Sequence, residues 1–152
     1  MTDDPRVLEL YKLAVEMADR VSARRTAANA FFATLHGGLA AAVGILGQAT
    51  SREVKASVYL LVAPIAGLAL SAAWFLLLRS YRDLNKAKFN VITEIERELP
   101  LQIFAKEWEQ LKKDPVEGWR GRYAEQGTVE RVIPAVFSVL YAAAIVRVLF
   151  SL

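Results

Sequence analysis

Few side chains in this sequence could support catalysis or metal binding. The chain has one histidine, His36, and no cysteine, which excludes a multi-histidine metal site, a thiolate metal site and a cysteine nucleophile. Its densest acidic run lies within residues 94–109, and such a run is usually a solvated helix face. The run consists of Glu94, Glu96, Glu98, Glu107 and Glu109. An enzyme needs a base, a nucleophile and a pocket. These parts cannot be assembled here, so we predict no catalytic residue, no metal and no cofactor.

The elements that would position these residues follow from the hydropathy of the chain. Hydrophobic residues make up 55% of the 152 residues, and the mean hydropathy is +0.28, which is high for a small soluble domain. The charged residues leave three gaps, at 26–51, 56–78 and 132–146. A bilayer core about 30 Å thick takes roughly 20 helical residues. The first two gaps reach that length, and the third does so if Arg147 extends to the far interface.

Basic residues lie before the first expected span, after the second and before the third. Because successive spans cross the membrane in opposite directions, these three positions are on the same side. Such residues favour the cytoplasmic side, so we place the N-terminus in the cytoplasm and the C-terminus outside a multi-pass membrane protein. We expect a single membrane domain over 1–152. Its parts are a cytoplasmic amphipathic helix at 1–26, spans at 27–48, 56–78 and 132–151, an outer loop at 49–55 and a cytoplasmic helical segment at 79–131.

Helical periodicity continues beyond the spans. The first helix is expected to run from Pro5 to about residue 48, and the second from the outer loop to Pro100. A short third helix is expected from Leu101 onwards, and Asp114-Pro115 is expected to end it. The tight outer loop makes the two long helices antiparallel, with apolar stripes facing each other in the cytoplasm. The first stripe is Leu8, Tyr11, Ala14, Val15, Ala18 and Val21, and the second is Tyr81, Leu84, Lys88, Val91, Ile95 and Leu99.

These elements define the fold class. It is an all-α integral membrane protein in which two long antiparallel helices extend from the bilayer into a cytoplasmic stalk. A short cytoplasmic helix and a third transmembrane helix complete it. In the second span, Ala63, Gly67 and Ser71 form a small-residue series, which predicts packing against the first span or a neighbouring subunit. Trp74 is expected in an interfacial aromatic belt.

The first span carries a face of small and polar residues at helical spacing. This face consists of Asn29, Ala33, His36, Ala40 and Gly44. Small residues let helices approach closely and polar residues bond across them, which favours a helix–helix packing face. Polar residues in a membrane also line water-filled passages. The same face is therefore a candidate pore lining, with His36 as a charge-sensitive gate.

Five arginines lie where the two long helices would leave the bilayer. They are Arg20, Arg24, Arg25, Arg79 and Arg82. We refer to these five residues as the arginine collar. It suits the headgroups of anionic lipids, and arginine forks also suit the phosphates of a nucleotide or another anion. No glycine-rich phosphate loop accompanies the collar. Because the membrane boundary accounts for the basic residues, we expect no nucleic-acid partner.

Three stretches of the sequence carry a family resemblance. The first is YKLAVEMADRVSARR at 11–25, followed by Ala28-Asn29 and Phe31-Phe32. The second is LRSYRDLN at 78–85, followed by Lys88-Phe89, ITEIE at 92–96 and Leu99-Pro100. The third is Glu107-Trp108-Glu109 together with Val132-Ile133-Pro134. With these motifs the chain resembles the RipA family of octameric bacterial membrane proteins. It is similar, more loosely, to the SLATT class of two-span effector modules in bacterial conflict systems.

The resemblance implies an octamer in the bacterial inner membrane, a role as a membrane effector in phage defence, and no catalytic residues. Apolar stripes outside the membrane also need partners, which favours a homo-oligomer. We predict a non-enzymatic pore, channel or membrane-disrupting effector that contacts anionic lipids and is triggered by a cytosolic protein or a nucleotide. The alternative is a structural scaffold that docks a cytosolic partner or an anionic ligand, with Trp108 as the candidate contact.

Overall fold

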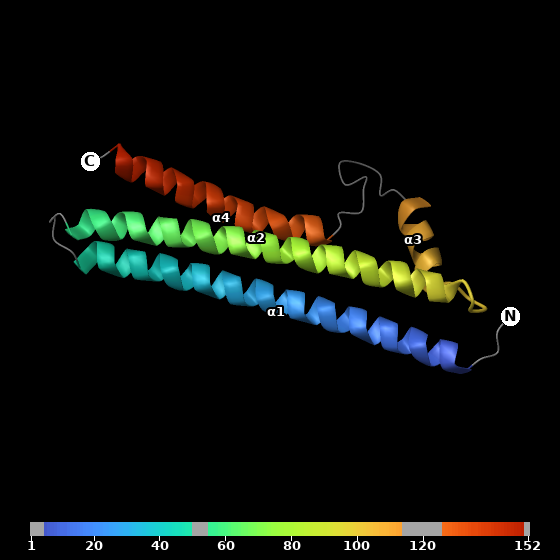
Figure 1. Cartoon of the computed structure of the whole chain (residues 1–152). Helices are drawn as coiled ribbons and strands as arrows, with labels where there is room; N and C mark the ends of the chain where they lie inside the picture. Colours follow the sequence, from blue (N-terminus) through green and yellow to red (C-terminus); the bar gives the residue numbers. More distant parts are fainter. Residues whose placement is uncertain (1–4, 50–54, 114–125, 151–152) are drawn as a thin grey trace. The chain divides into compact units, whose positions relative to one another are not determined.

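A computed structural model of the chain describes residues 5–49, 55–113 and 126–150. Within these ranges it contains four α-helices (Figure 1). They are α1 (Pro5–Ala49), α2 (Lys55–Glu96), α3 (Ile103–Lys113) and α4 (Gln126–Leu149). The predicted all-helical fold is confirmed, and α1, α2 and α4 each contain a segment long and apolar enough to cross a membrane. Most of the expected outer loop, at 50–54, lies outside the described residues.

Three helix ends differ from the prediction. The second long helix ends at Glu96 rather than at Pro100: proline disfavours helical backbone at Leu99, and from Arg97 on the amides bond to carbonyls three residues back instead of four. The chain tightens there, and the amide of Leu99 donates to the carbonyl of Glu96 at 3.0 Å. The third helix begins at Ile103 instead of Leu101. The last helix already begins at Gln126, since a membrane helix can continue into water beyond the lipid.

The chain packs as two compact units. We call Met1–Arg25 with Ser80–Thr128 the charged unit, and Thr26–Arg79 with Val129–Leu152 the apolar unit. The divisions between them fall within about one helical turn of the ends predicted for the three spans. Each unit has buried residues of its own, and the two are described separately below.

In the charged unit, α1 and α2 run antiparallel and α3 packs on α2. Most of the stripe predicted on α1 faces inward, with Ala18 and Val21 buried, but Leu8 is 46% exposed. The stripe predicted on α2 is right only in part, because Leu84 and Val91 are 46% and 52% exposed while its other four residues are half-buried. The inward face of α2 is rotated and carries Ile92 and Glu96, both fully buried. This face of α2 points inward because the carboxylate of Glu96 accepts hydrogen bonds from groups on α1 and α3, as described below.

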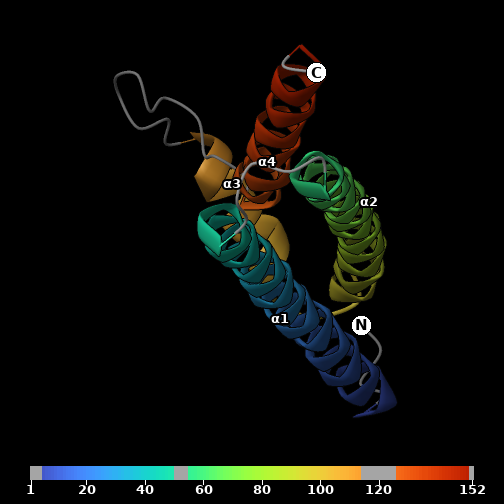
Figure 2. The ribbon, with the colours of Figure 1, turned by 90° about the vertical axis from the view of Figure 1, so that its left-hand side faces the viewer.

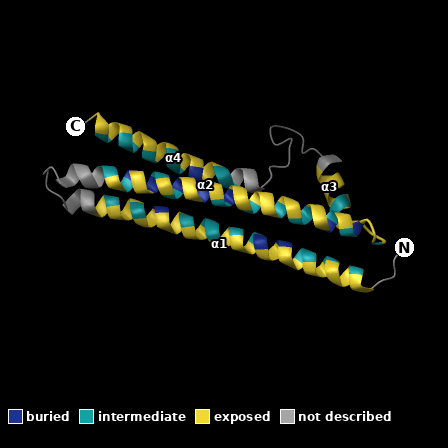
Figure 3. Cartoon of the chain, viewed as in Figure 1, coloured by how far each residue is buried: buried dark blue, intermediate teal, exposed yellow. Residues whose placement is uncertain are grey.

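In the apolar unit, α4 lies beside both α1 and α2 (Figure 2), as the side-chain contacts described below also show. The buried side chains are few and gather where the three helices meet. They include Trp74, Leu78, Ser71, His36 and Pro134. Elsewhere the helices are mostly exposed (Figure 3). Only 6% of the most apolar stretch of α4 is buried, against 28% for α2. Such bare apolar helices need lipid or other protein around them.

Candidate functional site

The single histidine is the centre of the apolar unit. His36 is fully buried, and its Nδ1 shares a hydrogen bond of 2.9 Å with the hydroxyl of Tyr141 on α4. Its Nε2 lies 3.5 Å from the hydroxyl of Ser71 on α2. The ring stacks on Phe137 with centroids 4.4 Å apart and planes 10° apart. One side chain of α1 therefore contacts both other helices of the unit.

The second polar residue of the predicted face, Asn29, also bonds within the chain. Its side-chain oxygen accepts a hydrogen bond of 2.8 Å from the indole nitrogen of Trp74. The indole is 1% exposed and stacks on Phe32 at 5.6 Å, with 6° between the planes. The ring of Trp74 therefore packs between helices rather than against lipid, and its predicted position at the membrane interface stays a prediction. Because Asn29 satisfies the only polar group of the indole, the whole side chain can be buried in an apolar setting.

The small-residue series of the second span contacts α1 through Ser71, as predicted, and also contacts α4 through Gly67, which was not predicted. A Cβ atom at Gly67 would overlap the ring of Tyr141, so this position allows the tyrosine to lie directly on the backbone of α2. Ser71, one turn later, faces His36. Sequence reasoning did not identify Tyr141 as part of this site. The signal available was the spacing of Phe137 and Tyr141, which puts two aromatic rings on one face of the last helix.

The remaining members of the predicted face lie apart from these contacts. Ala33, Ala40 and Gly44 are exposed. A Cβ atom at Gly37, Gly38 or Gly44 would have no neighbour within 4 Å. The face is thus divided along its length: Asn29 and His36 lie on the edge that faces α2 and α4, and the small residues lie on the open edge. Whether that open edge lines a pore or packs on another subunit stays a prediction.

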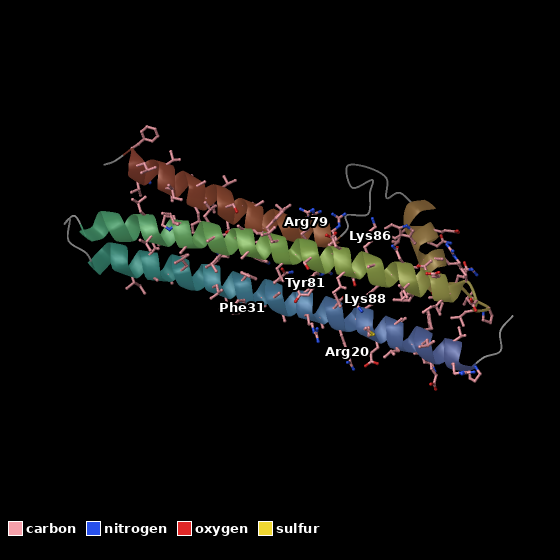
Figure 4. The ribbon with its side chains drawn as sticks, in the orientation of Figure 1. Arg20, Phe31, Arg79, Tyr81, Lys86 and Lys88 are labelled. Carbon is pink, nitrogen blue, oxygen red and sulfur yellow. The ribbon has the colours of Figure 1, made fainter. Side chains whose placement is uncertain are left out.

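The arginine collar is divided between the two units. Arg20, Arg24, Arg25 and Arg82 belong to the charged unit, and Arg79 belongs to the apolar unit. All except Arg25 are exposed. Arg20 extends from α1 (Figure 4) and pairs with Glu16, one turn earlier, at 2.6 Å. An exposed pair of this kind adds little stability. The binding of lipid or nucleotide phosphates by the collar stays a prediction.

A buried carboxylate joins the three helices of the charged unit. Glu96, the last residue of α2, accepts a hydrogen bond of 2.9 Å from the hydroxyl of Tyr11 on α1. It also accepts bonds from the backbone amides of Phe104 at 3.0 Å and Ala105 at 3.3 Å. These amides belong to the first turn of α3, where amide donors lack helical partners and the helix dipole favours a negative charge. The solvated face expected for Glu96 is therefore wrong.

The bond to Glu96 predicts an unusual titration of Tyr11. Burial and the hydrogen bond to the neighbouring carboxylate raise the pKa of Tyr11 to about 12. We expect the tyrosinate absorbance lost in Tyr11→Phe to titrate near that value, well above the ordinary tyrosine pKa of about 10. Because the folded state holds this proton more tightly, its contribution to stability is complete below about pH 10 and declines as the pH rises towards 12. A Tyr11 component titrating at the ordinary pKa would contradict the contact.

Over the part of the chain that the structure describes, no group of three or more histidine, cysteine, aspartate or glutamate side chains is placed to hold a metal ion. The contacts around His36 are with hydroxyl groups and aromatic rings. Those around Glu96 are with a phenol and amides. In this geometry both groups hold helices together.

The chain was also compared with known proteins. A family model described as the octameric membrane protein family (8xMP) matches residues 8–150. The chain belongs to this family. No curated protein and no solved structure gives a match. The 8xMP match confirms the resemblance to a family of octameric membrane proteins, and with three candidate spans it makes this chain a membrane protein. The narrower RipA and SLATT resemblances stay predictions.

Proposed function

We propose that this 8xMP chain is one subunit of a homo-oligomeric, non-enzymatic pore in the bacterial inner membrane. In this assembly, an octamer as the family name suggests, the open edge of α1 faces neighbouring subunits and a central passage. The bulky surface of α4 faces lipid. The N-terminus is cytoplasmic and the C-terminus lies outside.

The observation that carries this proposal is a difference between the surfaces of two helices of the apolar unit. On α4 the exposed surface is bulky and apolar, and includes Val136, Val139 and Leu140. On α1 it is mainly alanine and glycine, and the most apolar stretch of α1 has a mean hydropathy of 1.3 against 2.2 for α4. Bulky apolar surface is typical of contact with lipid tails, whereas small residues are typical of close helix contacts. Thr34 on the same exposed surface adds a hydroxyl.

Cysteine accessibility tests this arrangement cleanly, because the chain has no native cysteine. Ala33→Cys and Ala40→Cys would be compared with Ala142→Cys, an exposed alanine on α4. In liposomes we expect a charged, membrane-impermeant thiol reagent to modify the two α1 positions and to change ion leak. The α4 cysteine should stay unreactive because lipid surrounds it. Leaky liposomes in which both α1 cysteines are inert would show that the passage lies elsewhere.

A bulky side chain on the open edge should obstruct the passage. We expect Gly37→Leu to lower ion leak by about tenfold, since a constriction lined by apolar side chains excludes water and ions. The subunit should still fold, because a side chain at Gly37 meets no atom of its own subunit, and leak is compared only between samples with the same oligomeric state. Ala142→Leu on α4 is the matched control and should leave leak unchanged. Equal leak from both variants and the wild type would show that the open edge does not line the pore.

The RipA and SLATT resemblances support a role for this pore in phage defence, in which opening damages the membrane of the infected cell. A cytosolic protein or a nucleotide is the proposed trigger, and the arginine collar is the proposed contact for anionic lipid headgroups. Plaque counts on cells that express the wild type or Gly37→Leu would test this role. Protection that survives the blocked pore would contradict it.

A scaffold that docks a cytosolic partner is the second candidate function. Two large apolar side chains on α3 favour it, because Trp108 and Leu111 are 45% and 38% exposed. Tryptophan is common where protein partners bind most strongly. Co-purification of a partner that is lost in Trp108→Ala, together with silent liposomes, would favour this function over the pore.

A further inference from the structure

We infer that the neutral ring of His36 fastens α4 to α1 and α2, and that acid pH releases α4 by protonating this ring. The inference rests on the proposed function, because it describes how that pore is regulated. Its first support is the position of the ring, which is fully buried and lies between the three helices. The described contacts of α4 with the other two helices centre on this residue and on Gly67.

The second support is that none of the contacts described for the ring is with a negatively charged group. Ser71 and Trp74 face it from α2, and Phe137 and Tyr141 face it from α4. Tyr141 is the only titratable group among these contacts. The charge-free segments 26–51, 56–78 and 132–146 contain no carboxylate. The nearest in the chain are Asp19, Glu53, Asp83 and Glu130, each outside these segments.

An imidazolium in this position would be a buried cation without a counter-ion. The two hydroxyls could still accept its hydrogen bonds, and the aromatic faces would attract it. Neither effect replaces the hydration that a charged ring loses inside a low-dielectric membrane protein. The protonated ring is therefore stabilised by any arrangement that lets water reach it. Since α4 is the least buried of the three spans, it is the helix that moves.

Distances between spin labels test this release directly. Cysteines replace Val62 on α2 and Val139 on α4, which are 56% and 68% exposed, and labelled subunits are diluted with unlabelled ones to isolate the distance within one chain. We expect this distance to change by about 2 Å or more, or to broaden, between about pH 7.5 and about pH 4.5. A control pair at Phe31 and Leu76, on α1 and α2, should stay constant.

Two variants assign the change to the histidine. His36→Gln keeps a hydrogen-bonding side chain but cannot be charged, so it should abolish the pH response. Tyr141→Phe keeps the ring stack but removes the hydroxyl, so α4 should be released at a less acidic pH. A wild-type distance that is constant with pH would overturn the inference, and so would an equal response in His36→Gln.

The same samples separate this inference from the proposed function. If the liposomes leak at both pH values and the α4 distance does not change, the proposed pore is supported and the acid switch is contradicted. If the α4 distance responds to acid through His36 but the liposomes never leak, the switch is supported and the proposed pore is contradicted.

Discussion

Replacing Glu96 with alanine is expected to detach α3 from α2 and to be the most damaging single change in the charged unit. The side chain is fully buried, and it accepts hydrogen bonds from Tyr11, Phe104 and Ala105. Its removal leaves three donors without their acceptor, and an unsatisfied buried donor costs about 1–3 kcal/mol. Since these donors are only half-buried, we expect the free energy of unfolding to fall by about 2–4 kcal/mol in total.

Hydrogen exchange is the direct measurement of this loss. In Glu96→Ala the amides of α3 should exchange much faster than in the wild type, while those of α4 keep their protection. Glu94→Ala is the matched control, because Glu94 lies two positions earlier and is exposed. Glu96→Gln retains one acceptor oxygen and should give an intermediate result. Protection of α3 that is the same in Glu96→Ala and Glu94→Ala would mean that the packing of the Phe104 ring on Phe89 of α2, with centroids 5.4 Å apart, holds the helix.

The second large effect is expected from Trp74→Ala in the apolar unit. Truncating a buried tryptophan leaves a large cavity, and such changes cost about 3–5 kcal/mol. The indole also stacks on Phe32 and lies beside His36, so its loss loosens the contact of α1 with α2. The polar side chain of Asn29 would additionally lose its donor inside the membrane region. We expect the assembled protein to unfold at a markedly lower temperature in detergent.

The neighbouring residue supplies the control for this variant. Phe75 is 38% exposed, and Phe75→Ala removes a large aromatic ring from the helix surface without opening a cavity. Its effect should be small. Trp74→Phe separates packing from hydrogen bonding, because it keeps an aromatic ring but loses the bond to Asn29. Hydrogen bonds within membrane proteins are worth about 0.6–1.7 kcal/mol, so this variant should be only mildly destabilised. Equal loss in Trp74→Ala and Phe75→Ala would contradict the buried position.

The elements of the fold could be predicted because each depends on local composition. Three charge-free segments indicated the three helices that can cross a membrane, and an aspartate followed by proline indicated that α1 starts at Pro5. The register of α2 outside those segments could not be predicted in this way. Leu84 and Val91 were predicted to face inward because they are apolar, yet the inward face of α2 includes Glu96. The contact that explains this, between Tyr11 and Glu96, joins residues 85 positions apart.

The candidate site shows the same limit. The heptad spacing of Asn29 and His36 identified two polar residues on one face, but their partners lie on other helices. Tyr141 is 105 positions from His36, and Trp74 is 45 positions from Asn29. Helical spacing describes one helix at a time, so it could not distinguish the edge that faces α2 and α4 from the open edge with Ala33 and Gly44. That distinction required the three helices to be placed together.

The close approach of Tyr141 to Gly67 has a consequence for biogenesis. A hairpin of α1 and α2 made before α4 leaves the ribosome presents the imidazole of His36, the hydroxyl of Ser71 and bare backbone at Gly67 to its surroundings. Polar side chains are poorly tolerated by lipid. We therefore expect the nascent hairpin to stay beside the translocation machinery until α4 is synthesised and covers these groups. A chain truncated before α4 would be recognised by membrane quality control as an orphan, although both of its helices are complete.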